Sequence, residues 1–293
     1  SRAGALVIRR EDESAVGPLA DGAHACRGAW APGAYIGAVI CELFGDVGDW
    51  PDQDLIGFTA GLDADLTLAA YASGVFPMPL HESGYEGIGW WSPMRRGILP
   101  LSGLHVSRSL RKSLGRYTTS VDRAFARVLD GCADPSRPHG WIDEDIRAVY
   151  TELHERGRVH SVETWDGRGR LVGGLYGVGV RGLFAGESMF HDPRYGRDAS
   201  KTALVRLVDE LSADGAGRLL DMQWLTPHLA GLGGVEVPRR RYLELLGRAL
   251  ECADVAWPAP ATSVSRARSA LESYERRALE SSERSATGSH GCG

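Results

Sequence analysis

The segment VHSVETWDGRGRLVGGLYGVGVRGLFAGESMF, residues 159–190, contains three consecutive runs of residues that are typical of β-strands. The runs are Val159–Trp165, Leu171–Val180 and Gly182–Phe190, and the turn-forming pairs Asp166-Gly167 and Arg181-Gly182 separate them. Connections this short join antiparallel neighbours, because parallel strands need a crossover of about a dozen residues or more. The segment therefore predicts an antiparallel meander.

Helical patterns flank this meander on both sides. Amphipathic spacing predicts helices at Asp122–Cys132 and Asp143–Arg156 before it, and a helix at Ser200–Ala213, a strand at Arg218–Met222 and a helix at Arg239–Cys252 after it. Helices before a meander, followed by a helix and a strand, predict an α+β fold rather than a doubly wound parallel sheet.

The two ends of the chain differ in composition from the middle. Residues 1–54 are rich in Gly, Ala and acidic residues with weak periodicity, and we expect an irregular lead-in there. Residues 254–293 are rich in Ser, Arg and Glu. Apart from a possible helix near Val264–Leu279, we expect this tail to be disordered.

The overall composition is that of a soluble globular protein. Hydrophobic residues make up 43% and charged residues 24% of the 293 residues, with a mean hydropathy of −0.20. No apolar run reaches the roughly 18 residues of a membrane-spanning helix, and we expect no secretory signal. The five cysteines are scattered and never in CxxC spacing, which argues against disulfides or a zinc site. We therefore expect a cytoplasmic protein.

The net charge of −5 is distributed unevenly along the chain. Residues 1–93 hold 13 acidic and 4 basic residues, whereas residues 94–253 hold 20 acidic and 24 basic residues. One stretch of the second part has six basic residues and no acidic one: Arg95, Arg96, Arg108, Arg111, Lys112 and Arg116. Such a stretch attracts a polyanion, although a solvated helix face has the same pattern.

Several common catalytic motifs are missing from the sequence. The glycine-rich run Gly173–Gly179 lies between predicted strands, whereas a dinucleotide-binding loop leads from a strand into a helix. No Gly-x-Ser-x-Gly elbow, HExxH motif or His/Cys cluster is present, so neither a nucleophile nor a metal site is predicted.

Three polar residues occupy strand positions where apolar residues are usual. They are Glu187, Asp221 and Gln223, and the last two share one face by the period of two. A carboxylate in such a place must be paired or used, because burying it alone is costly. The alternatives are a structural ion pair with a core arginine and a functional polar centre.

A series of short motifs runs in one order through residues 55–250. The series comprises DADL (63–66), YASGVFPM (71–78), WWSP (90–93), LHVSRSLRK (104–112), GWI (140–142), GESMF (186–190), SKTAL (200–204) and DMQ (221–223). This ordered set resembles the bacterial leucyl/phenylalanyl-tRNA–protein transferases. The resemblance implies a small N-terminal α/β domain, here residues 55–93, and a C-terminal domain with a GNAT-like (acetyltransferase-like) fold, here residues 94–253.

The resemblance also implies an activity and its partners. Members of this family transfer Leu, and also Phe or Met, from aminoacyl-tRNA to the N-terminal Arg or Lys of proteins, which marks those proteins for degradation through the N-degron pathway. The implied partners are the acceptor end of the tRNA and proteins or peptides with such N-termini, with no membrane, DNA, metal or organic cofactor. A monomer is expected.

By the same resemblance, Asp221, Gln223 and Glu187 form the catalytic centre. We expect Gln223 to orient the attacking amine and Asp221 to hold its proton, because a carboxamide hardly accepts one. The basic residues between Arg95 and Arg116 would hold tRNA phosphates. Trp141 matches a tryptophan near the terminal adenosine, and the implied apolar pocket for the esterified side chain consists of Leu175, Phe184, Met189, Leu204, Leu207, Leu211 and Leu220.

Three other functions compete with this interpretation. An acyl-CoA N-acyltransferase would need a glycine-rich pyrophosphate loop, whereas His191–Ala199 contains one glycine and two acidic residues. A non-catalytic tRNA-binding adaptor would not need the three polar residues together. A relative that uses aminoacyl-tRNA to acylate a small-molecule or peptide amine in a biosynthetic pathway stays open.

Overall fold

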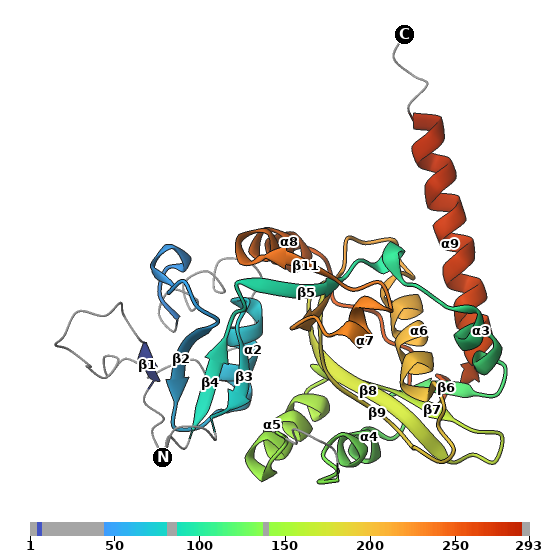
Figure 1. Ribbon diagram of the computed structural model, residues 1–293, viewed down its shortest axis with the longest axis horizontal. Coiled ribbons are helices and arrows are strands. Elements are labelled where there is room, and N and C mark those ends of the chain that lie inside the picture. Colours follow the sequence, from blue (N-terminus) through green and yellow to red (C-terminus); the bar gives the residue numbers. More distant parts are fainter. Residues whose placement is uncertain (1–4, 8–43, 81–86, 137–140, 289–293) are drawn as a thin grey trace.

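The computed structural model describes residues 5–7, 44–80, 87–136 and 141–288, and their strands form two sheets (Figure 1). The smaller sheet has the order β1-β2-β4-β3 with antiparallel neighbours. Its strands are β1 (Ala5–Val7), β2 (Leu55–Thr59), β3 (Phe76–Pro79) and β4 (Ile88–Trp91). The short helix η1 (Val47–Asp49) precedes β2, and α2 (Ala64–Ala72) connects β2 to β3.

The larger sheet has eight strands in the order β11-β5-β10-β9-β8-β7-β6-β12. Its strands are β5 (Arg95–Leu99), β6 (Thr118–Val121), β7 (Val159–Trp165), β8 (Leu171–Val180), β9 (Leu183–His191), β10 (Leu219–Gln223), β11 (Val235–Pro238) and β12 (Ser265–Arg266). The short helices η2 (Leu101–Gly103) and α7 (Pro227–Ala230) lie in its connections.

The meander predicted from residues 159–190 is confirmed. β7 pairs with β8 and β8 pairs with β9, both antiparallel. β10 instead runs parallel to β9, because α6 (Ala199–Leu211) carries the chain back across the sheet between them. The protein is therefore a mixed structure of helices around a large mixed sheet, in keeping with the α+β prediction, while the GNAT-like assignment stays a prediction.

Side chains of the central strands alternate between two cores on opposite faces of the larger sheet. Tyr176 and Leu219 belong to the first core, whereas their neighbours Leu175 and Leu220 belong to the second. The helices that pack into the first core are α4 (Phe125–Cys132), α5 (Glu144–Glu155) and α8 (Arg239–Glu251). Those that pack into the second are α3 (Arg108–Leu114), α6 and α9 (Ala267–Gly288).

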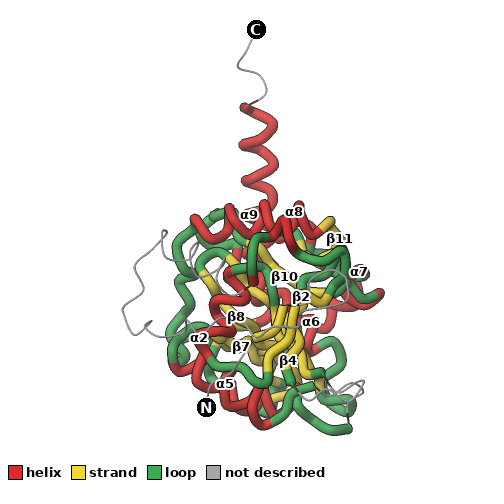
Figure 2. The backbone as a smooth tube through the Cα atoms, turned by 90° about the vertical axis from the view of Figure 1, so that its left-hand side faces the viewer, coloured by secondary structure: helices red, strands yellow, loops and turns green. Residues whose placement is uncertain are grey.

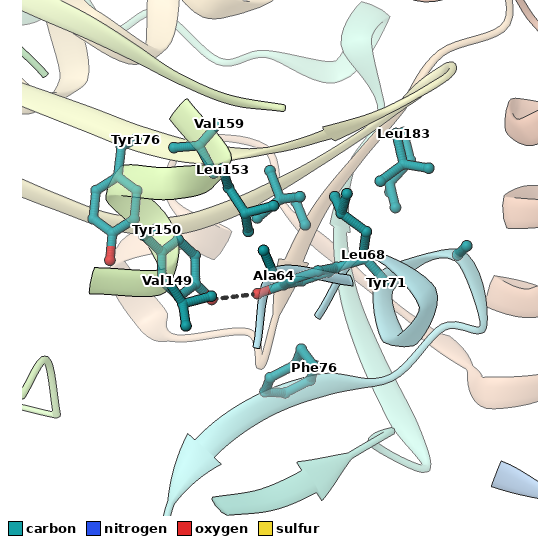
Figure 3. Packing of buried hydrophobic residues seen from close by; sticks show 14 of the residues in the cluster. Ala64, Leu68, Tyr71, Phe76, Val149, Tyr150, Leu153, Val159, Tyr176 and Leu183 are labelled. Atoms are coloured by element: carbon teal, nitrogen blue, oxygen red, sulfur yellow. Dashed lines mark hydrogen bonds between the residues drawn. The ribbon is translucent and has the colours of Figure 1, made fainter. Parts of the chain in front are cut away.

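Helix α2 joins the smaller sheet to the first core. Asp63 caps this helix by accepting the N–H of Leu66 at 2.8 Å, as Asp commonly does at a helix start. Leu68 and Tyr71 of α2 pack among first-core residues of α5, and Figure 3 shows Tyr71 meeting Tyr150 there. The N-terminal elements are thus packed directly against α5.

The described part of the tail contains the helix expected near Val264–Leu279, and this helix continues to Gly288. Ser265–Arg266 pairs with β6 as β12, and Ala267–Gly288 forms α9, which leads away from the body of the protein (Figures 1 and 2). Ala267, Ala270, Leu271 and Tyr274 are buried in the second core. Their helical spacing supplies an apolar stripe that the polar composition of the tail conceals. Residues 289–293 lie outside the described residues.

Over the ranges given above, no helix combines the length and the hydrophobicity that a membrane span needs.

Candidate active site

The structure brings together the three polar residues that the sequence singles out. β9 and β10 lie side by side, with Asp221 opposite Ala185 and Leu220 opposite Phe184. The side-chain nitrogen of Gln223 donates a hydrogen bond to Oε1 of Glu187 at 3.0 Å. The polar centre therefore lies just beyond the point where the parallel pairing of β9 and β10 ends.

Asp221 is fully buried and bound by four donors. Arg96 holds both carboxylate oxygens, with Nε 2.8 Å from Oδ1 and Nη2 2.5 Å from Oδ2. The Tyr242 hydroxyl donates to Oδ2 at 2.9 Å, and the backbone N–H of Gln223 donates to Oδ1 at 2.9 Å. Four donors occupy the acceptor capacity of a carboxylate. The expectation that Asp221 takes the proton of the attacking amine is therefore corrected: Asp221 forms the ion pair with a core arginine.

Arg96 cannot contact a tRNA phosphate, so that prediction is wrong. Its side chain is 1% exposed, and its guanidinium lies 4.6 Å from the ring centroid of Phe76 and 4.3 Å from that of Tyr242. Neighbouring residues of a strand point to opposite faces. Arg95 accordingly points outward, where it is 63% exposed and paired with Glu236, while Arg96 points into the protein.

Glu187 occupies an irregular position in β9. Tyr176 pairs with Ser188 and Gly177 pairs with Gly186, so Glu187 is the extra residue between two pairs. Such irregularities re-aim a side chain and recur beside active sites. Here the irregularity directs the carboxylate towards α5, where the Tyr150 hydroxyl donates to Oε2 at 3.0 Å.

Burial raises the pKa of Glu187 to about 7. The hydroxyls of Tyr71 and Tyr150 and the positive charge of Arg96 act in the opposite direction, while the negative charge of Asp221 adds to the rise. The two tyrosine hydroxyls lie 2.8 Å apart and are themselves buried (Figure 3). At neutral pH the carboxyl of Glu187 can therefore both take and release a proton.

Gln223 has an unusual backbone conformation. Its φ of +62° lies in the left-handed region, and the pairing of β10 with β5 is irregular between Asp221 and Gln223. Non-glycine residues seldom adopt this conformation, and it recurs at functional sites. The following residue, Trp224, packs its ring against Phe76 and Trp91 of the smaller sheet, at centroid distances of 4.9 and 5.7 Å.

The residues of the predicted apolar pocket lie together, but on the second-core face of the sheet. Met189 is partly buried there, and the others are at most 4% exposed; they are Leu175, Phe184, Leu204, Leu207, Leu211 and Leu220. The polar centre faces the first core. The two sets are close in sequence: Met189 lies two residues after Glu187, and the partly buried Met222 directly precedes Gln223.

Trp141 lies near the polar centre, beside Tyr150. Their rings are 6.4 Å apart, and Trp141 directly precedes α5, which Asp143 caps through the N–H of Ile146. Sequence reasoning placed Trp141 near the site but missed Tyr71, Tyr150 and Tyr242. In the sequence these tyrosines are marked only by a hydroxyl on a helix face that otherwise points into the core. A buried tyrosine hydroxyl needs a hydrogen-bond partner.

The remaining basic residues lie on the surface. Arg108, Arg111 and Lys112 are exposed on α3, and Arg116 follows it. Arg111 is not fully available to a phosphate, because its guanidinium lies 2.6 Å from a carboxylate oxygen of Glu275 on α9.

No metal ligand set was found in the part of the chain that the structure describes. Within those residues, no three or more His, Cys, Asp or Glu side chains gather as they would around a metal ion.

Comparison with known proteins decides the family. The model of the leucyl/phenylalanyl-tRNA protein transferases matches residues 98–247, and that of their N-terminal domain matches residues 61–94. A leucyl/phenylalanyl-tRNA–protein transferase of Gluconobacter oxydans (strain 621H) is 48% identical over 198 residues, which cover 66% of this chain and 85% of that protein. The chain belongs to the leucyl/phenylalanyl-tRNA–protein transferase family.

Other leucyl/phenylalanyl-tRNA–protein transferases show the same degree of similarity. The protein of Ruegeria sp. (strain TM1040) is 52% identical over 192 residues, covering 65% of this chain and 88% of that protein. Among solved structures, L-PGS from Bacillus licheniformis overlaps with a TM-score of 0.32 at 12% identity, over 58% of this chain and 56% of that one. The resemblance drawn from the order of the motifs is thus confirmed, and the L-PGS overlap is too weak to assign a fold.

Proposed function

We propose that this protein transfers Leu, and less readily Phe or Met, from aminoacyl-tRNA to the α-amine of proteins that begin with Arg or Lys, and that the product is directed to degradation. Membership of the transferase family supports the reaction class. The observation that carries the proposal is the hydrogen bond between Gln223 and Glu187, each two residues beyond the last parallel pair of β9 and β10.

In the proposed reaction the α-amine attacks the ester carbonyl of the aminoacyl-tRNA. An amide bond forms, the ester bond breaks, and the 3′-terminal ribose oxygen leaves with a proton. Because Gln223 donates its N–H to Glu187, its carbonyl oxygen is left to orient the amine. Glu187 then accepts the proton that the amine loses. The ester is already activated, so orientation can supply on the order of 7–11 kcal/mol of the barrier.

The remaining assignments follow as parts of this proposal. Residues 94–253 form a GNAT-like domain, an idea supported by the antiparallel run β6–β9 followed by the crossover α6 and the parallel strand β10. The apolar set around Leu175 and Leu204 receives the esterified side chain, and Trp141 lies near the terminal adenosine. Glu187 favours an acceptor that arrives as a cation. The protein acts as a cytoplasmic monomer without metal or organic cofactor.

A direct assay tests the reaction. Purified protein, leucyl-tRNA and a peptide that begins with Arg should yield a peptide with one added N-terminal Leu, detected by mass spectrometry. An acetylated N-terminus should block the product. If Arg- and Lys-started peptides stay unmodified while a small-molecule amine is acylated, the biosynthetic alternative replaces this proposal.

We expect the exposed face of α3 to set the salt dependence of tRNA binding. Arg108→Ala and Lys112→Ala should each lower the slope of log Kd against log salt by about 1, because each lost phosphate contact releases one counterion fewer. Glu275→Gln should raise that slope, because it frees Arg111 from its carboxylate partner. Filter binding of leucyl-tRNA at several salt concentrations measures the slopes.

Asp130→Asn is the matched control, because it removes a carboxylate partner of Arg147 on α5, outside the basic stretch, while leaving α3 unchanged. Slopes that stay the same in all three variants at α3 and α9 would show that the basic face of α3 is merely solvated.

A further inference from the structure

Arg96 is buried at a junction of four elements, and the proposed reaction leaves it without a role. Its guanidinium binds Asp221 of β10, donates to the carbonyl of Gly74 after α2 at 3.2 Å, and lies against the rings of Phe76 in β3 and Tyr242 in α8. Arg96 thus touches both sheets, and it binds the carboxylate that holds the backbone of Gln223.

A buried ion pair of this kind is weak evidence for a contribution to stability, because well-packed apolar residues often replace such a pair at no cost. In some proteins such buried polar groups instead select one arrangement of the chain. The arrangement to be selected here is the backbone at Gln223, whose φ of +62° is costly for a residue with a side chain. Asp221 stabilises that backbone by accepting its N–H.

We propose that Arg96 is a positioning residue for aminoacyl transfer, acting through Asp221 on Gln223; this rests on the proposed function. Arg96 and Tyr242 fix both oxygens of Asp221, Asp221 fixes the left-handed turn at Gln223, and that turn aims the Gln223 amide at Glu187. Arg96 touches no substrate.

The geometry requires an arginine at this position. Nε and Nη2 contact the two carboxylate oxygens, while Nη1 reaches the carbonyl of Gly74. A lysine ammonium carries the same charge but is a single point on a flexible stem, so it cannot hold both oxygens in one plane. Arg96→Lys therefore keeps the ion pair and loses the fixed orientation of Asp221.

Single-turnover leucine transfer from preloaded leucyl-tRNA tests the proposal. Arg96→Lys should slow transfer about tenfold and Tyr242→Phe about threefold, with the KM for leucyl-tRNA unchanged. In a Gln223→Ala background, Arg96→Lys should add less than about a twofold loss, because its effect passes through that side chain. The proposal would be overturned if the double variant lost rate by the product of the two single-variant factors. A normal single-turnover rate in Arg96→Lys would overturn it too.

Amide hydrogen exchange supplies a readout that does not depend on leucine transfer. In Arg96→Lys the N–H of Gln223 should exchange at least about tenfold faster, while that of Leu220 on the same strand stays protected. Unchanged exchange at Gln223 would contradict the positioning role. Leucine transfer by the unaltered protein is measured alongside, since its absence would contradict the proposed function and not the exchange result.

Leu129→Ala is the matched control for lost stability. Leu129 is 1% exposed on α4, in the first core but on a different helix from Tyr242. Its replacement should lower the melting temperature and leave the single-turnover rate unchanged at a temperature where both variants are folded. If Leu129→Ala slows transfer as much as Arg96→Lys does, the effect of Arg96 is on stability alone and the proposal is wrong.

Discussion

Asp221→Asn is expected to lower the free energy of unfolding by about 3–5 kcal/mol, because it leaves the guanidinium of Arg96 buried without its counter-charge. The new amide nitrogen would also face a donor of Arg96, so one hydrogen bond is replaced by a contact between two donors. Urea unfolding at pH 7, followed by circular dichroism, measures the change.

Two further variants show whether the unpaired charge is the cause. Glu152→Gln removes one of two carboxylate partners of Arg156, in a pair whose side chains are 41% and 49% exposed, and it should change stability by less than about 1 kcal/mol. Replacing the buried pair together, by Arg96→Met with Asp221→Leu, should restore most of the stability because no charge stays buried. A stability of Asp221→Asn close to that of the unaltered protein would contradict this account.

Local patterns predicted the elements of this fold well, because the information for each lies within a few residues. The alternation in residues 159–190 specifies β7, β8 and β9, and Asp63 and Asp143 cap the helices that they precede. The same alternation explains why the strand residues divide into two cores. What a periodic pattern cannot show is which face meets which partner.

The errors in the predicted site arise from contacts between residues that are far apart in the chain. Arg95 and Arg96 are indistinguishable by composition, and only the path of β5 places one in solvent and the other beside Asp221, 125 residues later. The polar centre was found because carboxylates on strands are unusual. Its tyrosines were not, since a tyrosine on an apolar helix face differs little from any other core residue.

Glu187→Gln is expected to lower the single-turnover rate of leucine transfer at pH 8 by about 100- to 10,000-fold, the usual range for loss of a general base. The amide keeps the size of the side chain and can still accept from the Tyr150 hydroxyl, but it cannot take a proton from the amine. Asp192→Asn, a carboxylate in the turn after β9, is the control and should leave the rate unchanged.

The pH dependence separates a base from a merely polar contact. Because the pKa of Glu187 is raised to about 7, the unaltered protein should gain activity from pH 6 to pH 8 as this carboxyl loses its proton. The α-amine of the peptide ionises at about 7.7–8.0 and adds to the same limb. Dividing the rate of the unaltered protein by that of Glu187→Gln removes the contribution of the amine. This ratio should grow as the pH rises through about 7. A ratio that is constant from pH 6 to pH 8 would show that Glu187 is no base.

Stability should vary with pH in the opposite sense to activity. The pKa of Glu187 is about 7 in the folded protein and 4.5 without the surrounding structure, so between these values the folded state binds more protons than the unfolded one. Stability linked to this group is therefore complete below pH 4.5 and is lost as the pH rises through about 7. Glu187→Gln removes the group that loses its proton, so its stability relative to the unaltered protein should be higher at pH 8 than at pH 5, by up to about 3 kcal/mol. Urea unfolding at the two pH values measures that difference. If Glu187→Gln is more stable than the unaltered protein at pH 8 but transfers leucine slowly, the site retains the carboxylate of Glu187 for its chemistry at a cost in stability.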